Sequence, residues 1–300
     1  MAEEGLQLFG GDWTERKLDA LGQYLRAYAK VLSKQSFQRV YLDAFAGTGY
    51  REQRVHPQLD YADIFADVDD LVQQEPQQFL DGSARIALKI EPAFHRYIFI
   101  DLSPSSAAEL VKLKEEFPQL AGAIDVRRGD ANAAIQEICA SWDRAGSRGV
   151  LFLDPFGMQV DWATIKAVGQ TKSIDVWILF PFAVNRVLTR FPQDIPPAWR
   201  KRLDAMFGSN DWLKKFYRER TIDDIFSGSE TVVEKALTLA GLGAYYMERL
   251  QTVFPIVAPN PCILRNTRNS PLFQLFFAAA NPGKGGAIAL KIAQHILTKI

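Results

Sequence analysis

The sequence contains few of the residues that bind metals or form disulfides. It has two cysteines, Cys139 and Cys262, which lie far apart in the chain, and three histidines, His56, His95 and His295. Neither the cysteines nor the histidines show the short spacings typical of a zinc site, and two isolated cysteines do not form a disulfide framework. We therefore expect no metal centre.

Long hydrophobic runs and an excess of one charge are also missing. No stretch approaches the roughly 18 uninterrupted apolar residues of a membrane-spanning helix. The segment 1–5 is acidic and lacks the apolar region of a secretory signal. Lysine plus arginine and aspartate plus glutamate both number 35, so the overall charge indicates neither nucleic acid nor membrane as a partner. The expected location is the reducing cytoplasm, away from membranes.

What remains is an ordinary globular composition. The chain has 300 residues, of which 48% are hydrophobic and 23% charged, enough for one large domain or two small ones. We predict a single domain over 1–300 with two insertions. The first, over 51–95, is acidic: residues 51–82 hold eight carboxylates against two arginines. The second, over 186–250, is basic and aromatic, and we expect it to be helical.

One stretch organises the rest of the chain. An apolar run over 37–42 leads into Asp43 and then into a Gly-x-Gly turn at Gly47 and Gly49. This pattern is typical of a buried first strand that ends at a nucleotide. Glycines allow the backbone to approach a ligand and to adopt φ angles closed to other residues. Phe45 and Ala46, inside the turn, belong to the same predicted site.

Two nucleotide ligands compete for this turn. NAD sites require a third glycine, and that position holds Glu52. A diphosphate at a helix N-terminus also gains nothing from an acid just upstream, such as Asp43. S-adenosyl-L-methionine carries a sulfonium and an ammonium instead, so it fits Asp43 better. A tight turn without any ligand remains the alternative.

Two later strand ends carry further acids. A strand over 97–100 ends at Asp101, which can accept hydrogen bonds from both ribose hydroxyls. A shorter strand leads to Asp130, which can accept from an adenine amino group. Each acid could instead cap the helix that follows it. We include Leu102 and Ala131, next in the chain, in the predicted donor site.

A second strong motif follows an entirely apolar strand over 150–153. It reads Asp154-Pro155-Phe156-Gly157. A carboxylate together with the carbonyl before or at a proline can hold two N–H groups of an attacking amine, and an aromatic side chain can stack on a base. Asp154, Pro155 and Phe156 are therefore the candidate catalytic residues. A simple proline turn at a strand end is the alternative.

The order of the elements predicts the fold class. Strands alternate with helices and a closing pair of strands follows, near 252–257 and 271–280, before a terminal helix. This order predicts an α/β, doubly wound, mostly parallel sheet of seven strands with an inserted helical lobe. Because right-handed crossovers place the carboxyl ends of parallel strands at one edge, Asp43, Asp101, Asp130 and Asp154 should converge there.

The first helix is predicted to begin at Asp12, with Glu15 completing a capping box. Its leucines recur at helical spacing and should pack beside the first strand. Trp13 and Lys17, at its start, could border the ligand pocket. We favour the simpler interpretation, in which Trp13 is an ordinary hydrophobic staple and Lys17 is a solvated lysine.

The basic insertion has three interpretations. Residues 186–220 hold nine Lys or Arg against four acids, with Trp199, Trp212, Phe216 and Tyr217 interleaved. Such a surface can bind phosphates and bases, or it can dock a protein, or it can be a solvated helical face. The residues that we predict to contact a nucleic acid or a partner are Lys201, Arg202, Lys214, Lys215 and Arg218.

These motifs carry a resemblance to known families. The stretch over 43–49 resembles motif I of class I S-adenosylmethionine-dependent methyltransferases, and 154–157 resembles motif IV of the branch that methylates amines. Across nearly the whole chain, the sequence resembles the three-Cys-motif partner protein family (TcmP). The matching parts are Trp13-Thr14-Glu15-Arg16-Lys17-Leu18, the Asp-x-Phe-Ala-Gly stretch, Leu153 to Gly157, Leu275 to Ala278, and Asn281-Pro282.

The resemblance implies a class I methyltransferase fold of Rossmann-like type, a site for S-adenosyl-L-methionine, and a nearby-encoded partner that carries the three cysteines. It does not supply the substrate. Motif IV departs from the usual Asp/Asn-Pro-Pro-aromatic pattern, because Phe156 replaces the second proline and Gly157 the aromatic. Base stacking would then come from Phe156, Phe180 or Phe182.

Two classes of function follow. The first is a methyltransferase that modifies an exocyclic amine, in RNA or DNA. The second is a scaffold or binding partner that kept the fold and works mainly by docking a three-Cys-motif protein.

Overall fold

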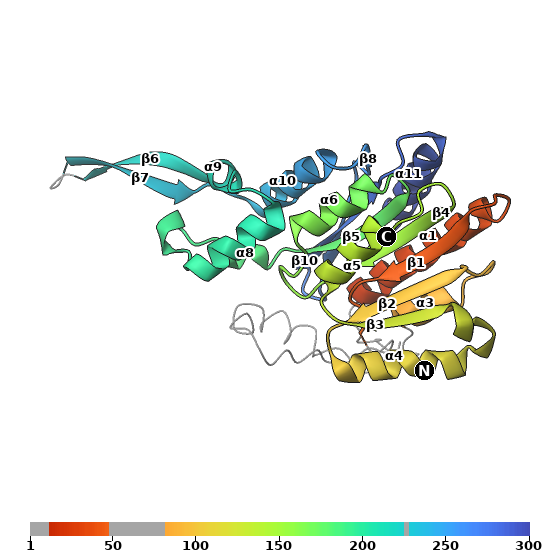
Figure 1. Ribbon diagram of the computed structural model, residues 1–300. Helices are drawn as coiled ribbons and strands as arrows, with labels where there is room; N and C mark the ends of the chain where they lie inside the picture. The colour runs from red at the N-terminus through yellow and green to blue at the C-terminus, as the bar shows by residue number, and fades with distance from the viewer. Residues whose placement is uncertain (1–11, 48–81, 225–227) are drawn as a thin grey trace, which may run out of the picture.

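The computed structural model describes residues 12–47, 82–224 and 228–300. A mixed sheet with helices on both faces forms the body of the protein, and a lobe extends from it (Figure 1). The acidic segment over 51–81 and the second turn glycine, Gly49, lie outside the described residues.

Five parallel strands form the larger part of the sheet, in the order β3-β2-β1-β4-β5. Four of them are almost entirely buried, which explains their continuous apolar sequences. The strands are β1 (Gln38–Asp43), β2 (Arg96–Asp101), β3 (Ile124–Arg128), β4 (Ser147–Leu153) and β5 (Ile174–Pro181). After β3 the chain crosses back to the other side of β1, so β1 and β4 lie side by side.

The far side of the sheet closes with an antiparallel strand. Strand β10 (Pro271–Ala279) pairs with β5 and with β8 (Ile256–Val257), and β9 (Cys262–Arg265) pairs with the other end of β10. The seven strands of the main path confirm the predicted sheet, and β9 is an eighth. The strand expected over 252–257 shrinks to two residues, because the turn that follows helix α10 (Leu239–Gln251) occupies its first part.

Helices cover both faces of the sheet. Tyr24 of α1 (Asp12–Leu32) packs on Trp177 and Phe277, whereas Tyr246 of α10 packs on Phe180 and Phe276. Because neighbouring residues of a strand point to opposite faces, α1 and α10 lie on opposite sides of the sheet. Helices α3 (Ser83–Leu88) and α11 (Lys284–Leu297) pack on α1. Helix α5 (Ala131–Ala140) packs on α6 (Trp162–Gln170). Helix α4 (Pro104–Glu116) lies along β2 and β3.

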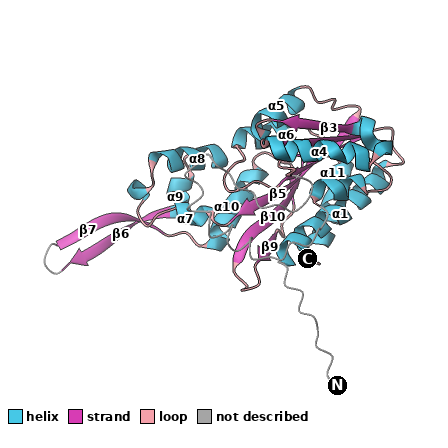
Figure 2. Cartoon of the chain, turned by 90° about the horizontal axis from the view of Figure 1, so that it is seen from below, coloured by secondary structure: helices cyan, strands magenta, loops and turns pink. Residues whose placement is uncertain are grey.

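The lobe follows directly from β5. It contains α7 (Val184–Val187), α8 (Pro197–Phe207), α9 (Trp212–Phe216) and then a β-hairpin of β6 (Tyr217–Asp224) and β7 (Gly228–Lys235). The helical insertion predicted from the sequence therefore includes helices, but sequence analysis missed the hairpin. Its pairing partners include the β-branched Thr221, Thr231 and Val232, which favour strands. The hairpin extends away from the body (Figure 2).

Among the residues that the structure describes, no helix is both long enough and apolar enough to cross a membrane.

Candidate functional site

The turn after β1 lies at the carboxyl edge of the parallel strands. The backbone N–H of Ala44 donates to Phe152 of β4 at 3.2 Å, and that of Ala46 donates to Ile100 of β2 at 3.0 Å. Gly47 has a φ of +61°, a conformation that glycine adopts without strain. The neighbouring strands thus hold the turn in place on both sides.

Asp101, at the end of β2, binds this turn directly. Its Oδ2 accepts from the backbone N–H of Gly47 at 2.9 Å, and its Oδ1 accepts from that of Ser103 at 2.8 Å. The side chain of Ser103, not Asp101, caps helix α4. The cap interpretation of Asp101 is therefore wrong. Leu102, next to it, is 59% exposed, an unusual environment for a leucine.

Asp130 has a different role in the structure. Its Oδ1 accepts from the backbone N–H of Ala133 at 2.8 Å, so Asp130 is the N-cap of α5. The cap interpretation is confirmed here. The Asp130 side chain is exposed and Ala131 is buried, and a contact of either residue with a ligand stays a prediction.

Asp43 lies completely buried beneath the turn. Its Oδ2 accepts from the hydroxyl of Tyr41 at 3.1 Å. Burial, together with the nearby Asp43 carboxylate, raises the pKa of Tyr41 well above its ordinary value, so this phenol stays protonated and donates the hydrogen bond. A contact or a charge effect of Asp43 on a ligand stays a prediction.

Asp154 follows β4 and forms the other half of the site. Its Oδ2 lies 2.7 Å from the Nζ of Lys17, and the two side chains are only 19% and 8% exposed. The Lys17 ammonium also lies 4.8 Å from the centre of the Trp13 ring. The expectation of a solvated lysine is therefore wrong, because the first helix carries Lys17 into the site.

The sequence did contain a signal for this lysine. The buried stripe of α1 runs through Trp13, Leu21, Tyr24 and Tyr28. Position 17 falls on the same stripe, four residues from both Trp13 and Leu21, at the spacing of one helical face. A charged residue within an apolar stripe is a sign of a buried partner.

The loop after Asp154 explains the departure from the usual motif. Pro155 is buried, and the backbone N–H of Phe156 donates to Oε1 of Gln159 at 2.9 Å. Gly157 has a φ of +62°. An aromatic residue at position 157 would be strained in this left-handed conformation, whereas glycine is not.

Of the three aromatics considered for stacking, only Phe156 is partly accessible. Phe180 is completely buried, and its ring centre lies 4.4 Å from that of Tyr246. Phe182 is 4% exposed. Neither of these two can stack on a base without a rearrangement of the core. The candidate stacking residue is therefore Phe156, which is half-buried.

Five basic residues of the lobe were predicted to contact a nucleic acid or a partner, and two of them, Arg202 and Lys215, form ion pairs within the protein. Arg202 forms an ion pair with Asp161 and donates to the carbonyl of Met158, which fastens α8 to the segment after the Asp154 loop. Lys215 pairs with Glu248 at 3.1 Å. The side chains of Lys201, Lys214 and Arg218 are exposed.

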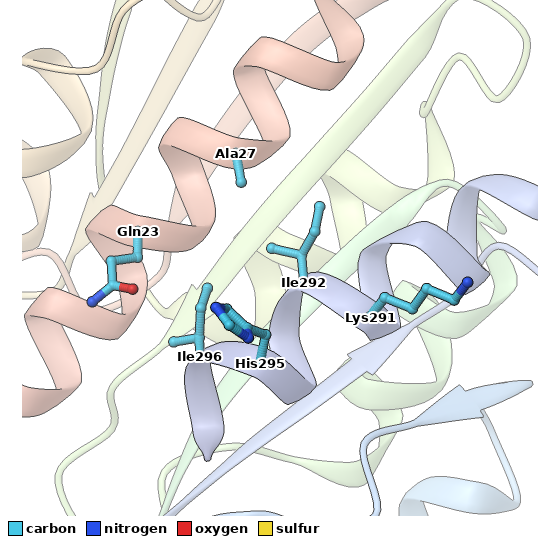
Figure 3. Close-up of a pocket in the computed structure, with 6 residues that line it drawn as sticks. All are labelled: Gln23, Ala27, Lys291, Ile292, His295 and Ile296. Carbon is cyan, nitrogen blue, oxygen red and sulfur yellow. The ribbon is translucent and has the colours of Figure 1, made fainter. Parts of the chain in front are cut away.

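Two shallow pockets in the described part of the chain lie away from this edge. One, of about 400 Å³, lies between α1 and α11 and is lined by Gln23, Ala27, Ile292 and His295 among others (Figure 3). The other, of about 460 Å³, includes Lys214, Lys215 and Glu248. The described residues contain no cluster of three or more His, Cys, Asp or Glu that could hold a metal ion.

The strand order β3-β2-β1-β4-β5-β10-β8, with only β10 antiparallel to the others of that path, defines a Rossmann-like class I methyltransferase fold. The glycine turn, Asp101 and Asp154 lie at the edge where such folds bind their ligands.

A comparison with solved structures found several similar chains. A Legionella pneumophila protein of the family described as DUF519 has 13% identity and a TM-score of 0.49 over 94% of this chain and 91% of its own. A spermidine synthase in complex with a transition-state analogue has 10% identity and a TM-score of 0.40, over 94% of this chain and 64% of its own. The O-methyltransferase TomG from Streptomyces achromogenes, in complex with SAM, has 14% identity and a TM-score of 0.31, over 78% of this chain and 92% of its own. No protein-family model matches the chain, and no curated protein matches it.

Proposed function

We propose that the protein is an S-adenosyl-L-methionine-dependent methyltransferase that modifies an exocyclic amine of a nucleic acid. One observation carries the proposal. Asp154 follows β4, the strand paired with β1, so the acid lies at the same edge as the Gly47 turn. A donor bound at the turn and an amine bound at Asp154 would therefore be neighbours.

The residues of the turn fit the donor. The Gly47 backbone has no side chain to block a ligand, Asp101 is fixed beside it, and the exposed Leu102 offers an apolar surface to a flat ring. S-adenosyl-L-methionine, when bound, supplies a methyl group on a positively charged sulfur. The buried carboxylate of Asp43 lies beneath this edge and would favour a cationic ligand over a diphosphate.

The residues of the Asp154 loop fit an amine. The Asp154 carboxylate and the Pro155 carbonyl would accept the two N–H groups and so aim the nitrogen lone pair at the methyl carbon. Phe156 would stack on the base that carries the amine. The nearby lobe, with Lys201, Lys214 and Arg218 exposed, would bind the phosphates.

We further propose that the protein belongs with the three-Cys-motif partner proteins and acts with a partner of that kind. The support for this is the sequence resemblance that includes the Trp13–Leu18 segment, in which Trp13 and Lys17 are buried.

The decisive experiment is transfer of labelled methyl from the donor to total RNA, DNA and protein, with and without a three-Cys-motif protein encoded nearby. We expect label in nucleic acid, on an amino group of a base after digestion to nucleosides. The matched control is Asp154→Ala. Absence of transfer with the partner present would contradict the proposal and favour a scaffold that only docks its partner.

A further inference from the structure

The ion pair between Lys17 and Asp154 joins three distant parts of the chain. The two residues are 137 positions apart, and their charged atoms lie within 2.7 Å. The ring of Trp13, near the Lys17 ammonium, stacks on Phe273 of β10 with ring centres 4.8 Å apart. The lysine is thus held by its own helix, by the loop after β4 and by the aromatic pair that connects α1 to β10.

Stability alone does not explain this pair. Removing two charges from water is costly, and the attraction between them often only offsets that cost. Helix α1 already buries a large apolar surface, including Leu21, Tyr24 and Leu25. Two apolar residues at positions 17 and 154 would serve packing at least as well, which indicates that the charges have another role.

We propose, on the basis of the proposed function, that Lys17 is a specificity-determining residue that restricts the site to neutral amines. An alkylammonium, such as the side chain of a protein lysine, enters as a cation. To bind beside Asp154, it would need the negative charge of that carboxylate to be available. In this structure the Lys17 ammonium already neutralises that carboxylate. A second cation would face repulsion from Lys17 and from the sulfonium of the donor. The exocyclic amine of a base is uncharged and meets no such repulsion.

The pair still allows Asp154 to position the amine. A carboxylate has about four acceptor sites, so it can accept from the Lys17 ammonium and from an N–H group of an amine at the same time. In the reaction, the nitrogen lone pair forms a bond to the methyl carbon while the carbon–sulfur bond breaks and its electrons leave with sulfur as a thioether. The nitrogen, now positively charged, then releases one proton to water. Lys17 and Asp154 end the reaction as they began it.

Three variants and two small cations test the proposal. Lys17→Met removes the charge, Lys17→Arg keeps it, and Lys17→Met with Asp154→Asn replaces the charged pair by a neutral one. Each is assayed for transfer of labelled methyl to total RNA and DNA, and for donor affinity by calorimetry. n-Butylammonium chloride serves as the alkylammonium competitor. Tetramethylammonium chloride, which cannot donate a hydrogen bond, controls for ionic strength.

We expect Lys17→Met to lower kcat/KM for the nucleic acid by about 100-fold or more, because the Asp154 carboxylate without this counter-charge attracts cations that compete with the neutral amine; donor affinity should stay unchanged within about threefold. n-Butylammonium should inhibit Lys17→Met but not the wild type. The double variant should recover at least about tenfold over Lys17→Met, since an asparagine amide accepts a hydrogen bond without needing a counter-charge. Lys17→Arg should retain part of the activity and the resistance to n-butylammonium.

Each outcome has a distinct meaning. A wild type that transfers methyl, together with a Lys17→Met variant that is equally active or equally resistant to n-butylammonium, overturns the role of Lys17 and leaves the proposed function in place. A folded Lys17→Met variant that loses donor binding also overturns it, because Lys17 would then act at the donor. Absence of any transfer by the wild type overturns the proposed function and this inference together.

Discussion

The carboxylate of Asp101 connects two backbone segments at the carboxyl edge of the sheet. One oxygen accepts from the N–H of Gly47 at 2.9 Å and the other from the N–H of Ser103 at 2.8 Å. Asp101 therefore fixes the glycine turn of β1 relative to the start of α4. A ligand that rests on this turn therefore depends on Asp101 for the shape of the turn, and direct hydrogen bonds from the ligand to Asp101 stay a prediction.

The first prediction is that Asp101→Ala weakens binding of S-adenosyl-L-methionine. Each lost hydrogen bond to a charged group costs roughly 1.5–3 kcal/mol, which corresponds to about a 10- to 160-fold increase in Kd. Isothermal titration calorimetry measures this directly. Asp101→Asn keeps the shape and one acceptor oxygen, so it should lose less affinity than Asp101→Ala.

The same calorimetry tests the choice between donor and dinucleotide. We expect the wild type to bind S-adenosyl-L-methionine and not NAD, because Asp43 precedes the turn and the third glycine is missing. Micromolar binding of NAD without any response to the methyl donor would contradict the assignment of the turn.

The second prediction is that Asp154→Ala lowers turnover and spares donor affinity. The loss should be about 10²- to 10⁴-fold, as for other positioned acid–base groups, while the donor Kd changes by less than about threefold. Because the variant leaves the buried Lys17 without this carboxylate, circular dichroism must confirm the fold. If Asp154→Ala abolished donor binding and Asp101→Ala did not, the two acids would have exchanged roles.

Most of the fold could be predicted from the sequence, because the signals are local. Strands β1, β2 and β4 are largely apolar and end at or just before an acid. The order of the strands sets the edge at which Asp101 and Asp154 lie. The hairpin β6–β7 was missed because its residues are mostly charged or polar, as in Arg218, Glu219 and Arg220. Such a sequence gives no apolar alternation, and the hairpin is defined by its own cross-strand pairing.

The site was less accessible to sequence reasoning, because it depends on contacts between distant residues. The pairing of Lys17 with Asp154 joins residues that lie 137 positions apart in the chain, and no local sequence pattern predicts such a contact. The assignment of Asp101 and Asp130 also required structure. Both precede a helix, yet Asp130 caps its helix and Asp101 binds the neighbouring turn.

The third prediction concerns the lobe. If it binds nucleic acid, affinity should fall steeply with salt, because each phosphate contact releases counterions. Replacing the exposed Lys214 and Arg218 by alanine should make the slope of log K against log[salt] shallower by about 1 to 2. Lys291, an exposed residue of α11, provides the matched control. An unchanged slope in the double variant would favour a docking or merely solvated surface.

A buried acid away from the carboxyl edge leads to the last prediction. Asp175 lies near the start of β5 and accepts from the hydroxyl of Tyr24 at 2.7 Å. Burial raises the pKa of Asp175 from 3.8 to about 7, although Tyr24 and the charge of Arg148 partly offset this effect. The folded state therefore holds a proton on Asp175 at pH values where the unfolded chain has lost it.

Asp175 should make the protein less stable as pH rises. Between about pH 4 and 7 the folded state binds more protons than the unfolded state, so the free energy of unfolding falls, by up to roughly 4 kcal/mol from this group. Below this window its contribution is fully present, and above it the contribution is lost. Asp175→Asn, which cannot ionise, should remove this slope in urea titrations across the window. The exposed Asp194→Asn is the control and should keep the wild-type slope. A slope that persists in Asp175→Asn would show that another group causes it.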